Sequence, residues 1–455
     1  MSSVESRQSV AVIGTGMAGL ITAYILRNDP RARFDVEVFE KQKELSLDSA
    51  SLTVKTNAGT EQRVDLPMRA FASGFYDNLR RMYDYLGIEY GSQRFIFPFS
   101  TISESNPNDM HTRFIHSSHT HQFPPLRPRG SSWASWLVEA LYLLVCYLWM
   151  VACSFFIEPR QGDGSRPSET FRQYAARICL PQYFVKHYYL PIMSAVTTCP
   201  HDALLNFPAV DIVDYQAKTF RKPHYTVIGG VSKVQDKLSK GLNVRYSSAA
   251  TKVENVGSKA QLTWKNDDTG FVESKLYDHV IMAVTPDVVR AIFSPLRSAL
   301  AVIPTASVPA YVHRDFDRLK KCSQVVDGNI NPEPGLPPPE RIHLCSNSSS
   351  TEFTHEHLSS VIITTSPIIP IDPSKIEHTV TFTRTLRTPI SRKVTNEIFG
   401  PPSQSDVDSK QWRNGDGNVW LVGSWCWDGM VLLEGCIASA LRIADSLDIE
   451  VPWAS

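Results

Sequence analysis

A glycine-rich turn between a predicted strand and a predicted helix constrains the fold of this chain more than any other feature. Residues 10–13 are apolar and predict a buried parallel strand, and the sequence Gly-Thr-Gly-Met-Ala-Gly follows at 14–19. Gly14 would permit a tight turn, Gly16 a close approach of the backbone to a pyrophosphate, and Gly19 close packing of the helix on the strand. The N-terminus of that helix would present free N–H groups to phosphate oxygens.

An acidic residue stands where a dinucleotide site needs one. Val36–Phe39 predicts a second strand, and Glu40 follows it about 20 residues beyond the glycines, the place of a carboxylate that binds ribose hydroxyls. The alternative is a chance glycine-rich turn with Glu40 as a surface charge. The strand–turn–helix context favours the dinucleotide site, because an isolated G-x-G-x-x-G pattern carries little information without it.

Length and composition exclude several classes of protein. The chain has 455 residues, which favours two interleaved domains over one core. The formal net charge is zero, so no basic excess supports a nucleic-acid partner. Eight cysteines show no C-x-x-C or His–Cys spacing and predict reduced thiols. The only early apolar run is the first strand itself, so we expect no signal peptide and a cytoplasmic protein.

Four histidines in one short segment raise the question of a metal site: His111, His116, His119 and His121. Their spacing is irregular, and no pattern of carboxylates or cysteines joins them, as a metal site would require. The segment runs into two prolines at 124–125, which is typical of a polar loop. We therefore predict no metal site in this chain.

The most apolar segment, 133–157, is compatible with several environments. Residues 140–157 carry no charge, while about 20 apolar residues are needed to cross a bilayer. A single span would place the glycine motif and the C-terminal part of the chain on opposite sides of a membrane. We therefore favour a buried helix, or one that dips into a membrane surface, over a span. The segment could also line an apolar substrate tunnel.

A second strand–glycine–helix unit follows about 400 residues after the first. Asn418–Gly429 contains an apolar strand that meets Gly423, and 433–447 predicts a helix. Between the two units, 277–284 predicts another buried strand, and the strands expected within 298–390 favour a largely antiparallel sheet.

Four segments in this order resemble the FAD-dependent amine oxidase and phytoene desaturase superfamily, and most closely its NAD/FAD-binding, amine-oxidase-like branch. They are 14–19 with Glu40, 64–71, 227–230 with 280–286, and 422–424 followed by 433–440. Residues 310–315 also resemble the His-x-Asp segment of that branch. The resemblance implies an α/β fold, in which a Rossmann-type FAD-binding domain is interleaved with an α+β substrate domain that contains a mostly antiparallel sheet.

The resemblance also implies FAD as the cofactor and assigns residues to each of its parts. The diphosphate would lie on Gly14, Thr15, Gly16, Met17, Ala18 and Gly19. Glu40 would bind the adenosine ribose, and the backbone of Val253 would meet the adenine. The flavin end would lie along Gly423, Ser424, Gly435 and Cys436. There the C-terminal helix would point its N-terminus at the N1–C2=O edge, where reduced flavin carries negative charge.

The chain departs from the family pattern in two places. The usual Gly-Gly pair with a basic residue is replaced by Lys-Glu-Leu-Ser-Leu-Asp-Ser at 43–49, and Ser424 stands where an acid is usual. Cofactor binding would then rest on Lys41, Lys43 and Arg69. Cys426 invites a covalent flavin link, but its position does not match the family's attachment cysteine, which favours an inert thiol.

Three residues are candidates for the catalytic site. His313 and Asp315 would be polar groups of the active site, although a strand end beside a loop is an equal alternative. Trp425 would flank the flavin together with Trp427, and plain packing is the alternative for both indoles.

The predicted FAD-binding domain comprises 1–72, 222–295 and 405–455, and the predicted substrate domain comprises 73–221 and 296–404. We expect hydride transfer from a hydrophobic small molecule, such as a lipid, isoprenoid or polyketide, to flavin N5. Membrane-surface contact through 133–157 remains open, as does the oligomeric state. The alternatives are a redox-neutral flavin-dependent isomerase and a non-catalytic membrane-associated scaffold. An NAD-only dehydrogenase would not need the second strand–glycine–helix unit.

Overall fold

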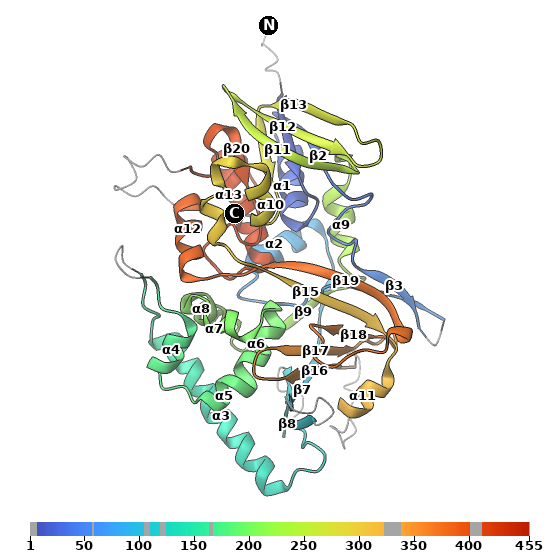
Figure 1. Cartoon of the computed structure of the whole chain (residues 1–455), viewed down its shortest axis with the longest axis vertical. Coiled ribbons are helices and arrows are strands. Elements are labelled where there is room, and N and C mark those ends of the chain that lie inside the picture. The colour runs from blue at the N-terminus through green and yellow to red at the C-terminus, as the bar shows by residue number, and fades with distance from the viewer. Residues whose placement is uncertain are drawn as a thin grey trace.

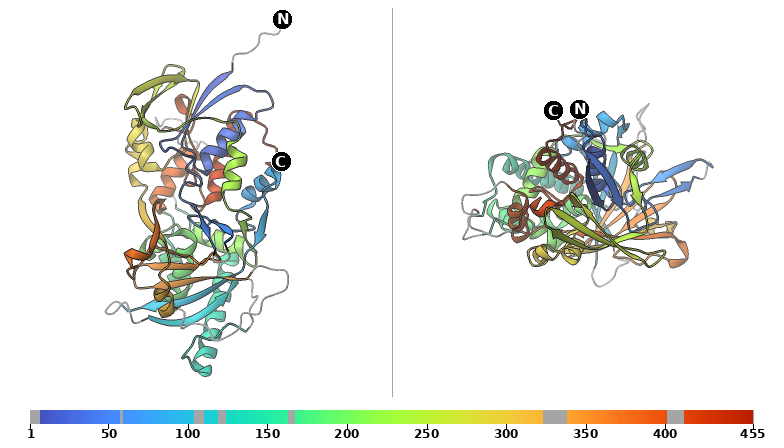
Figure 2. Two further views of the ribbon diagram at one scale, coloured as in Figure 1. Left: turned by 90° about the vertical axis from the view of Figure 1, so that its right-hand side faces the viewer. Right: turned by 90° about the horizontal axis from the view of Figure 1, so that it is seen from above.

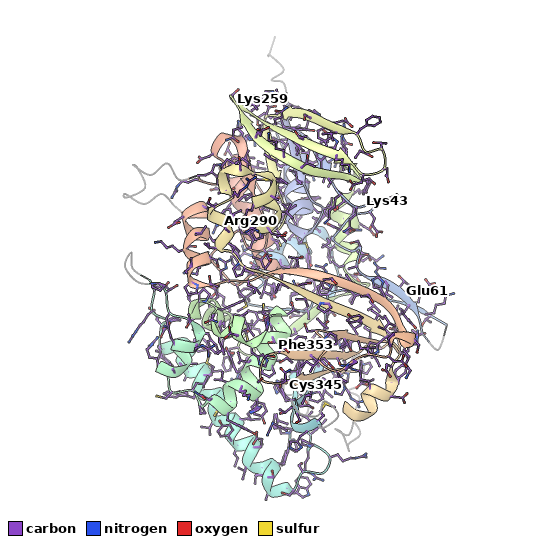
Figure 3. All side chains as sticks on the ribbon, viewed as in Figure 1. Lys43, Glu61, Lys259, Arg290, Cys345 and Phe353 are labelled. Carbon is purple, nitrogen blue, oxygen red and sulfur yellow. The ribbon has the colours of Figure 1, made fainter. Side chains whose placement is uncertain are left out.

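The computed structural model describes residues 7–56, 59–103, 110–118, 124–162, 167–322, 338–400 and 412–454. Its elements form two domains stacked along the long axis of the molecule (Figure 1). Figure 3 marks the two domains by Lys259, on a three-stranded sheet at the top, and by Cys345 and Phe353, on neighbouring strands of a larger sheet below.

The upper domain is built on a five-stranded sheet in which every pair of neighbouring strands is parallel. The strand order is β10 (Asn243–Arg245), β2 (Phe34–Phe39), β1 (Gln8–Ile13), β14 (His279–Met282) and β20 (Val419–Leu421). Strands far apart in the sequence therefore lie side by side, and β1 is central. This arrangement confirms the predicted Rossmann-type domain and brings the two strand–glycine–helix units together.

The two faces of this sheet are covered by different layers. Val10 and Val12 of β1 pack with helices α1 (Met17–Arg27), α9 (Ser232–Ser239) and α13 (Leu433–Ser446). Ala11 and Ile13 point the other way and pack with a three-stranded antiparallel sheet and α10 (Pro286–Ile292). The strands of that sheet are β11 (Ser248–Val256), β12 (Lys259–Asn266) and β13 (Val272–Tyr277). Because successive residues of β1 point into two different cores, its residues 10–13 are all apolar.

The lower domain contains a seven-stranded sheet that is antiparallel except for one pair, β16 with β7. This confirms the mostly antiparallel sheet. The strand order is β19 (Ile376–Thr385), β15 (Thr305–His313), β18 (Ile362–Thr365), β17 (Thr351–Glu356), β16 (Glu340–Ser346), β7 (Phe95–Ile102) and β8 (Met110–Ser117).

Helices lie beside this sheet and complete the lower domain (Figures 1 and 2). They are α3 (Trp133–Phe156), α4 (Phe171–Arg177), α5 (Gln182–Phe184), α6 (Leu190–Thr197), α7 (His201–Leu205) and α8 (Ala209–Thr219). A π-helical turn, Val185–Tyr189, joins α5 to α6. The sheet also carries α11 (Phe316–Cys322), and α12 (Pro389–Phe399) leads back to the upper domain.

Several short elements connect the two domains. A small sheet contains β5 (Phe71–Ala72), β9 (His224–Val227) and β6 (Tyr90–Ser92), and a hairpin contains β3 (Leu52–Lys55) and β4 (Glu61–Val64). Helix α2 (Asp77–Leu86) contacts α13 of the upper domain, although the sequence-based boundary at residue 73 assigns it to the substrate domain. The hairpin packs on the lower sheet through Val54 and Val64.

Helix α3 forms the lower tip of the molecule (Figures 1 and 2). In the described residues it is the one helix long and apolar enough to cross a membrane by length and composition. Only 28% of its most apolar window is buried. Of the two alternatives favoured for 133–157, the buried helix does not describe most of the surface of α3, because neighbouring elements cover one side of it alone, and the membrane-dipping helix stays a prediction.

Candidate active site

The glycine turn after β1 has the geometry that its sequence predicts. Gly14 has a φ of +99° and donates its N–H to the Phe39 carbonyl at 2.8 Å. A Cβ atom at Gly19 would lie 2.0 Å from the Gly14 carbonyl oxygen, so only glycine fits there. At Gly16, by contrast, a Cβ atom would meet nothing within 4 Å. The first and last glycines are thus required by the fold, while the middle one leaves room for a ligand.

Glu40 is buried beside this turn. Its Oε2 accepts the backbone N–H of Thr15 at 3.1 Å and also the Thr15 hydroxyl, and its Oε1 accepts the N–H of Gln42 at 2.9 Å. The carboxylate therefore holds the glycine turn against the end of β2. Each oxygen has more than one lone pair, so a ribose hydroxyl could still donate to it. Ser248, at the start of β11, donates its N–H to the Glu40 carbonyl at 2.8 Å.

Arg69 brings a cation close to both strand–glycine–helix units. Its Nη2 donates to the Leu47 carbonyl at 2.7 Å, while its Nε is buried without a hydrogen-bond partner. Desolvation lowers the pKa of Arg69, and the nearby Asp65 carboxylate opposes that shift. Asp65 is itself occupied, since it accepts the N–H of Val231 at 2.9 and 3.1 Å. An orphaned guanidinium N–H next to the glycine turn fits an anion such as a diphosphate.

The N-terminus of α13 meets that of α1. The thiol of Cys436 is buried against the backbone of Ala18 and of Ser424, and desolvation raises the pKa of Cys436 to about 12. The thiol is therefore neutral and poorly nucleophilic. Gly423 donates its N–H to Ser439 Oγ at 3.1 Å, which ties the end of β20 to α13. Neither helix N-terminus is capped by a side chain, so both leave N–H groups for a ligand.

These residues fit FAD. The glycine turn, the two uncapped helix termini and the Arg69 guanidinium would hold the diphosphate, and Glu40 would hold the ribose. Val253 is buried in β11, in the same core as Ile13 and Phe39. Lys41 is exposed, and no described contact ties it to the turn. Met17, at the first position of α1, is buried in the core, so only its backbone is available to a cofactor.

Comparison with known proteins agrees with this site. Residues 12–86 match the family model of an NAD(P)-binding Rossmann-like domain, and residues 164–366 match that of the flavin containing amine oxidoreductases. The chain belongs to the FAD-dependent amine oxidase superfamily. As a member, it is an FAD-dependent oxidoreductase. No curated protein sequence matches it.

Two solved structures share the fold of this superfamily member. One is a "Putative protoporphyrinogen oxidase" from Exiguobacterium sp. 255-15, with a TM-score of 0.56 and 12% identity over 98% of this chain and 99% of that chain. The other is a putrescine oxidase bound to putrescine, with a TM-score of 0.59 and 13% identity over 97% of this chain and 99% of that chain. At these identities the likeness extends to the fold alone.

Sequence reasoning missed an aromatic cluster at the flavin end. The Phe75 ring lies 6.0 Å from that of Trp427, 4.9 Å from that of Tyr215 and 5.0 Å from that of Tyr76. Trp427 also covers the first turn of α13, since a Cβ atom at Gly435 would lie 2.4 Å from its Nε1. These rings come from three distant parts of the chain, so no local pattern could have joined them. Together the four rings form a largely buried aromatic cluster, the aromatic wall, beside the first turn of α13.

The predicted active-site pair His313 and Asp315 makes structural contacts within the lower domain. His313 is fully buried near the far end of β15, where its Nε2 pairs with Thr364 Oγ1 at 2.8 Å and its Nδ1 accepts the Asp315 N–H at 3.1 Å. Asp315 binds Lys375 Nζ at 3.0 Å. Both side chains are satisfied within the lower sheet, about 25 Å along β15 from Thr305, which lies nearer the upper domain. These contacts correspond to the structural alternative, and a catalytic role for either residue stays a prediction.

Trp425 and Cys426 lie in the protein core. Trp425 is buried in the core with its indole N–H on the Val284 carbonyl at 3.1 Å and its ring 5.8 Å from that of Phe399. This placement corresponds to the packing alternative and not to a flavin contact. Desolvation raises the pKa of Cys426 well above its ordinary value, so the thiol is inert.

No cluster of three or more histidine, cysteine, aspartate or glutamate side chains that could hold a metal occurs in the described residues. His111 and His116 lie on β8, while His119 and His121 lie outside the described residues.

Proposed function

We propose that this FAD-dependent oxidoreductase oxidises a hydrophobic metabolite of the lipid, isoprenoid or polyketide type, a class typical of secondary metabolism. One observation carries the proposal: the aromatic wall of Phe75, Tyr76, Tyr215 and Trp427 lies at the flavin end, and the buried carboxylates described near it face protein groups. A free carboxylate is a common partner of a buried ammonium group, so its absence among the described residues near this wall favours a substrate without an ammonium group.

Of the two buried acids nearby, Glu434 is hydrogen-bonded, while the Asp211 carboxylate forms no hydrogen bond with the described residues but lies beside two arginines. Glu434, in the first turn of α13, accepts the N–H groups of Asn78 and Leu79 at 3.0 and 3.1 Å and thereby caps α2. Asp211 of α8 lies 3.4 Å from Arg392 Nε, and the buried guanidinium of Arg387 lies close enough to act on its charge. Both acids serve the fold, which supports an uncharged or anionic substrate.

Arg384 would meet a polar group on such a substrate. It lies near the end of β19, where its Nε donates to Thr198 Oγ1 at 2.7 Å, and no described carboxylate pairs with it. Desolvation lowers the pKa of Arg384, and Arg69 adds to that shift. A desolvated guanidinium without a counterion favours a carboxylate, enolate or carbonyl oxygen in the ligand.

The residues of this chain would act mainly by positioning. When bound, FAD supplies the hydride acceptor, N5, for a substrate C–H bond. The aromatic wall would orient the apolar body of the substrate and exclude water, and Arg384 would fix its oxygen. The uncapped N-terminus of α13 would favour negative charge beside it.

The test has two stages. Gently purified protein should show an oxidised-flavin absorption spectrum that acid precipitation releases into solution. Candidate substrates should then bleach that spectrum without air, with products two hydrogens lighter. Arg384→Gln should retain FAD but lower kcat/KM by about tenfold or more for acidic substrates, and far less for neutral ones.

Other outcomes of the same test would replace the proposal. Conversion without a change of mass or oxygen uptake would instead support the redox-neutral isomerase. A colourless protein that takes up no added FAD would support the scaffold. Bleaching by polyamines and not by apolar compounds would overturn the substrate class.

A further inference from the structure

Helix α3 exposes an apolar face that no described element covers. We define its outer face by seven residues that are each more than half exposed: Leu137, Val138, Leu141, Leu144, Val145, Leu148 and Phe155. Trp133 and Phe156 at the two ends are 69% and 85% exposed. A soluble helix places charged side chains on such a face, yet no charged residue occurs there.

The opposite face of α3 holds the helix to the protein. Leu143, Cys146, Met150 and Cys153 recur at helical spacing and are buried, and the helix contacts α8 and β8. Its single charged residue, Glu139, is also directed to the protein, because its Oε1 accepts the hydroxyls of Tyr183, at 3.0 Å, and Tyr188. The helix thus divides lengthwise into a protein-facing side and an apolar outer side.

This division is incompatible with a simple span. A spanning helix would carry α8 and β8 into the hydrocarbon, together with Asp214 and Lys218 of α8, which pair with each other at 2.9 Å near the surface. Polar backbone and charges are costly there. A helix that lies in the plane of the interface exposes one face to lipid and keeps the other on the protein, as α3 does.

Cations flank the outer face at both ends. The Arg127 guanidinium lies 4.8 Å from the Trp133 ring centre, and Arg129 beside it is exposed. At the other end the Phe155 ring lies 6.1 Å from that of Phe220, which is followed by exposed Arg221 and Lys222. One exposed acid, Glu158, lies at that end as well. An apolar strip with aromatic ends and a basic excess complements a bilayer with anionic headgroups.

We propose that the outer face of α3 docks the protein, in the plane of the interface, onto a membrane surface that contains anionic lipids. Docking would bring α8, which carries Tyr215 of the aromatic wall, next to the lipid. The docking does not depend on the reaction that the enzyme catalyses.

Vesicle flotation of the full-length protein tests this docking. The probes are vesicles of phosphatidylcholine alone and of phosphatidylcholine with phosphatidylserine. Wild-type protein should float with both, and more completely with the anionic vesicles at low salt. Leu141→Glu with Leu148→Glu should lower the partition coefficient by about tenfold or more. Arg221→Gln with Lys222→Gln should reduce only the gain from phosphatidylserine.

A matched control carries the same charges at the opposite end of the molecule. Phe271→Glu with Val272→Glu changes two apolar residues, 71% and 64% exposed, in the loop and strand after β12, and should float like wild type. Equal flotation of the α3 variant and wild type would overturn the proposal. Resistance of bound protein to alkaline carbonate would show a span instead. A lipid-free dimer that the α3 variant dissociates would assign the face to a second copy of the chain.

Discussion

Helices α1 and α3 are both apolar, yet they have opposite surroundings. Nine of the eleven residues of α1 are buried, whereas five of the 24 residues of α3 are. α1 lies between the parallel sheet, α9 and α13, so protein surrounds it. α3 has neighbours on one side only. An apolar composition therefore shows that a helix avoids water. The tertiary structure decides whether protein or another apolar medium surrounds it.

The largest expected effect distinguishes the two helices by the same substitution. Leu20→Ala in α1 removes a fully buried side chain and should lower the free energy of unfolding by about 3 kcal/mol. Leu141→Ala in α3 should change it by less than about 0.5 kcal/mol, because the side chain is already exposed. Urea unfolding of both variants measures the difference. Equal losses of unfolding free energy in the two variants would mean that other protein groups cover α3 in solution.

A second prediction extends the comparison to buried polar groups. Burial lowers the pKa of His313 to about 4, so the folded protein keeps the ring neutral and its Nδ1 accepts the Asp315 N–H. The contribution of His313 is complete above pH 6.5 and is lost as the pH falls towards 4. The difference between a pKa of 6.5 and one of about 4 corresponds to about 3 kcal/mol.

His313→Gln keeps a polar side chain without the titration. Between pH 7 and pH 4, the melting temperature of this variant should fall less steeply than that of wild type. His187, His201 and His357 have pKa values lowered in the same direction and provide the remaining slope. Identical slopes for wild type and variant would refute the assignment.

A third prediction concerns the open position in the glycine turn. Gly16→Val should leave the stability of the FAD-free protein almost unchanged, since a Cβ atom meets nothing there and φ is −68°. It should weaken FAD binding by about tenfold or more, because the side chain would occupy the approach to the phosphates. Flavin fluorescence titration measures the affinity. Gly19→Val is the contrasting variant and should fail to fold, because its Cβ would overlap the Gly14 carbonyl.

The smallest effect on FAD affinity is expected for Lys41, a predicted cofactor-binding residue. Lys41→Ala should change FAD affinity less than about twofold, because the side chain is exposed and has no described tie to the turn. Arg69→Met should weaken the affinity much more, since it removes the buried guanidinium whose Nε has no described hydrogen-bond partner. A larger loss for Lys41→Ala than for Arg69→Met in the same titration would reverse this ranking.

Contiguous patterns accounted for most of the fold that could be predicted. The two strand–glycine–helix units carry their periodicity, turn residues and spacing within short segments, and the structure places Glu40 and Gly423 beside them. The aromatic wall could not be foreseen, because Phe75, Tyr215 and Trp427 meet only after folding. The surroundings of His313 could not be foreseen either, because its hydrogen-bond partner Thr364 lies 51 residues later in the sequence.

The capping of α2 by Glu434 has a consequence for biosynthesis. Glu434 lies in the helix that follows β20, while its hydrogen-bond partners Asn78 and Leu79 are about 355 residues earlier. During translation, the start of α2 therefore stays uncapped until almost the whole chain has left the ribosome. A chain that ended before β20 would lack this edge strand and α13, and with them the second strand–glycine–helix unit of the cofactor site.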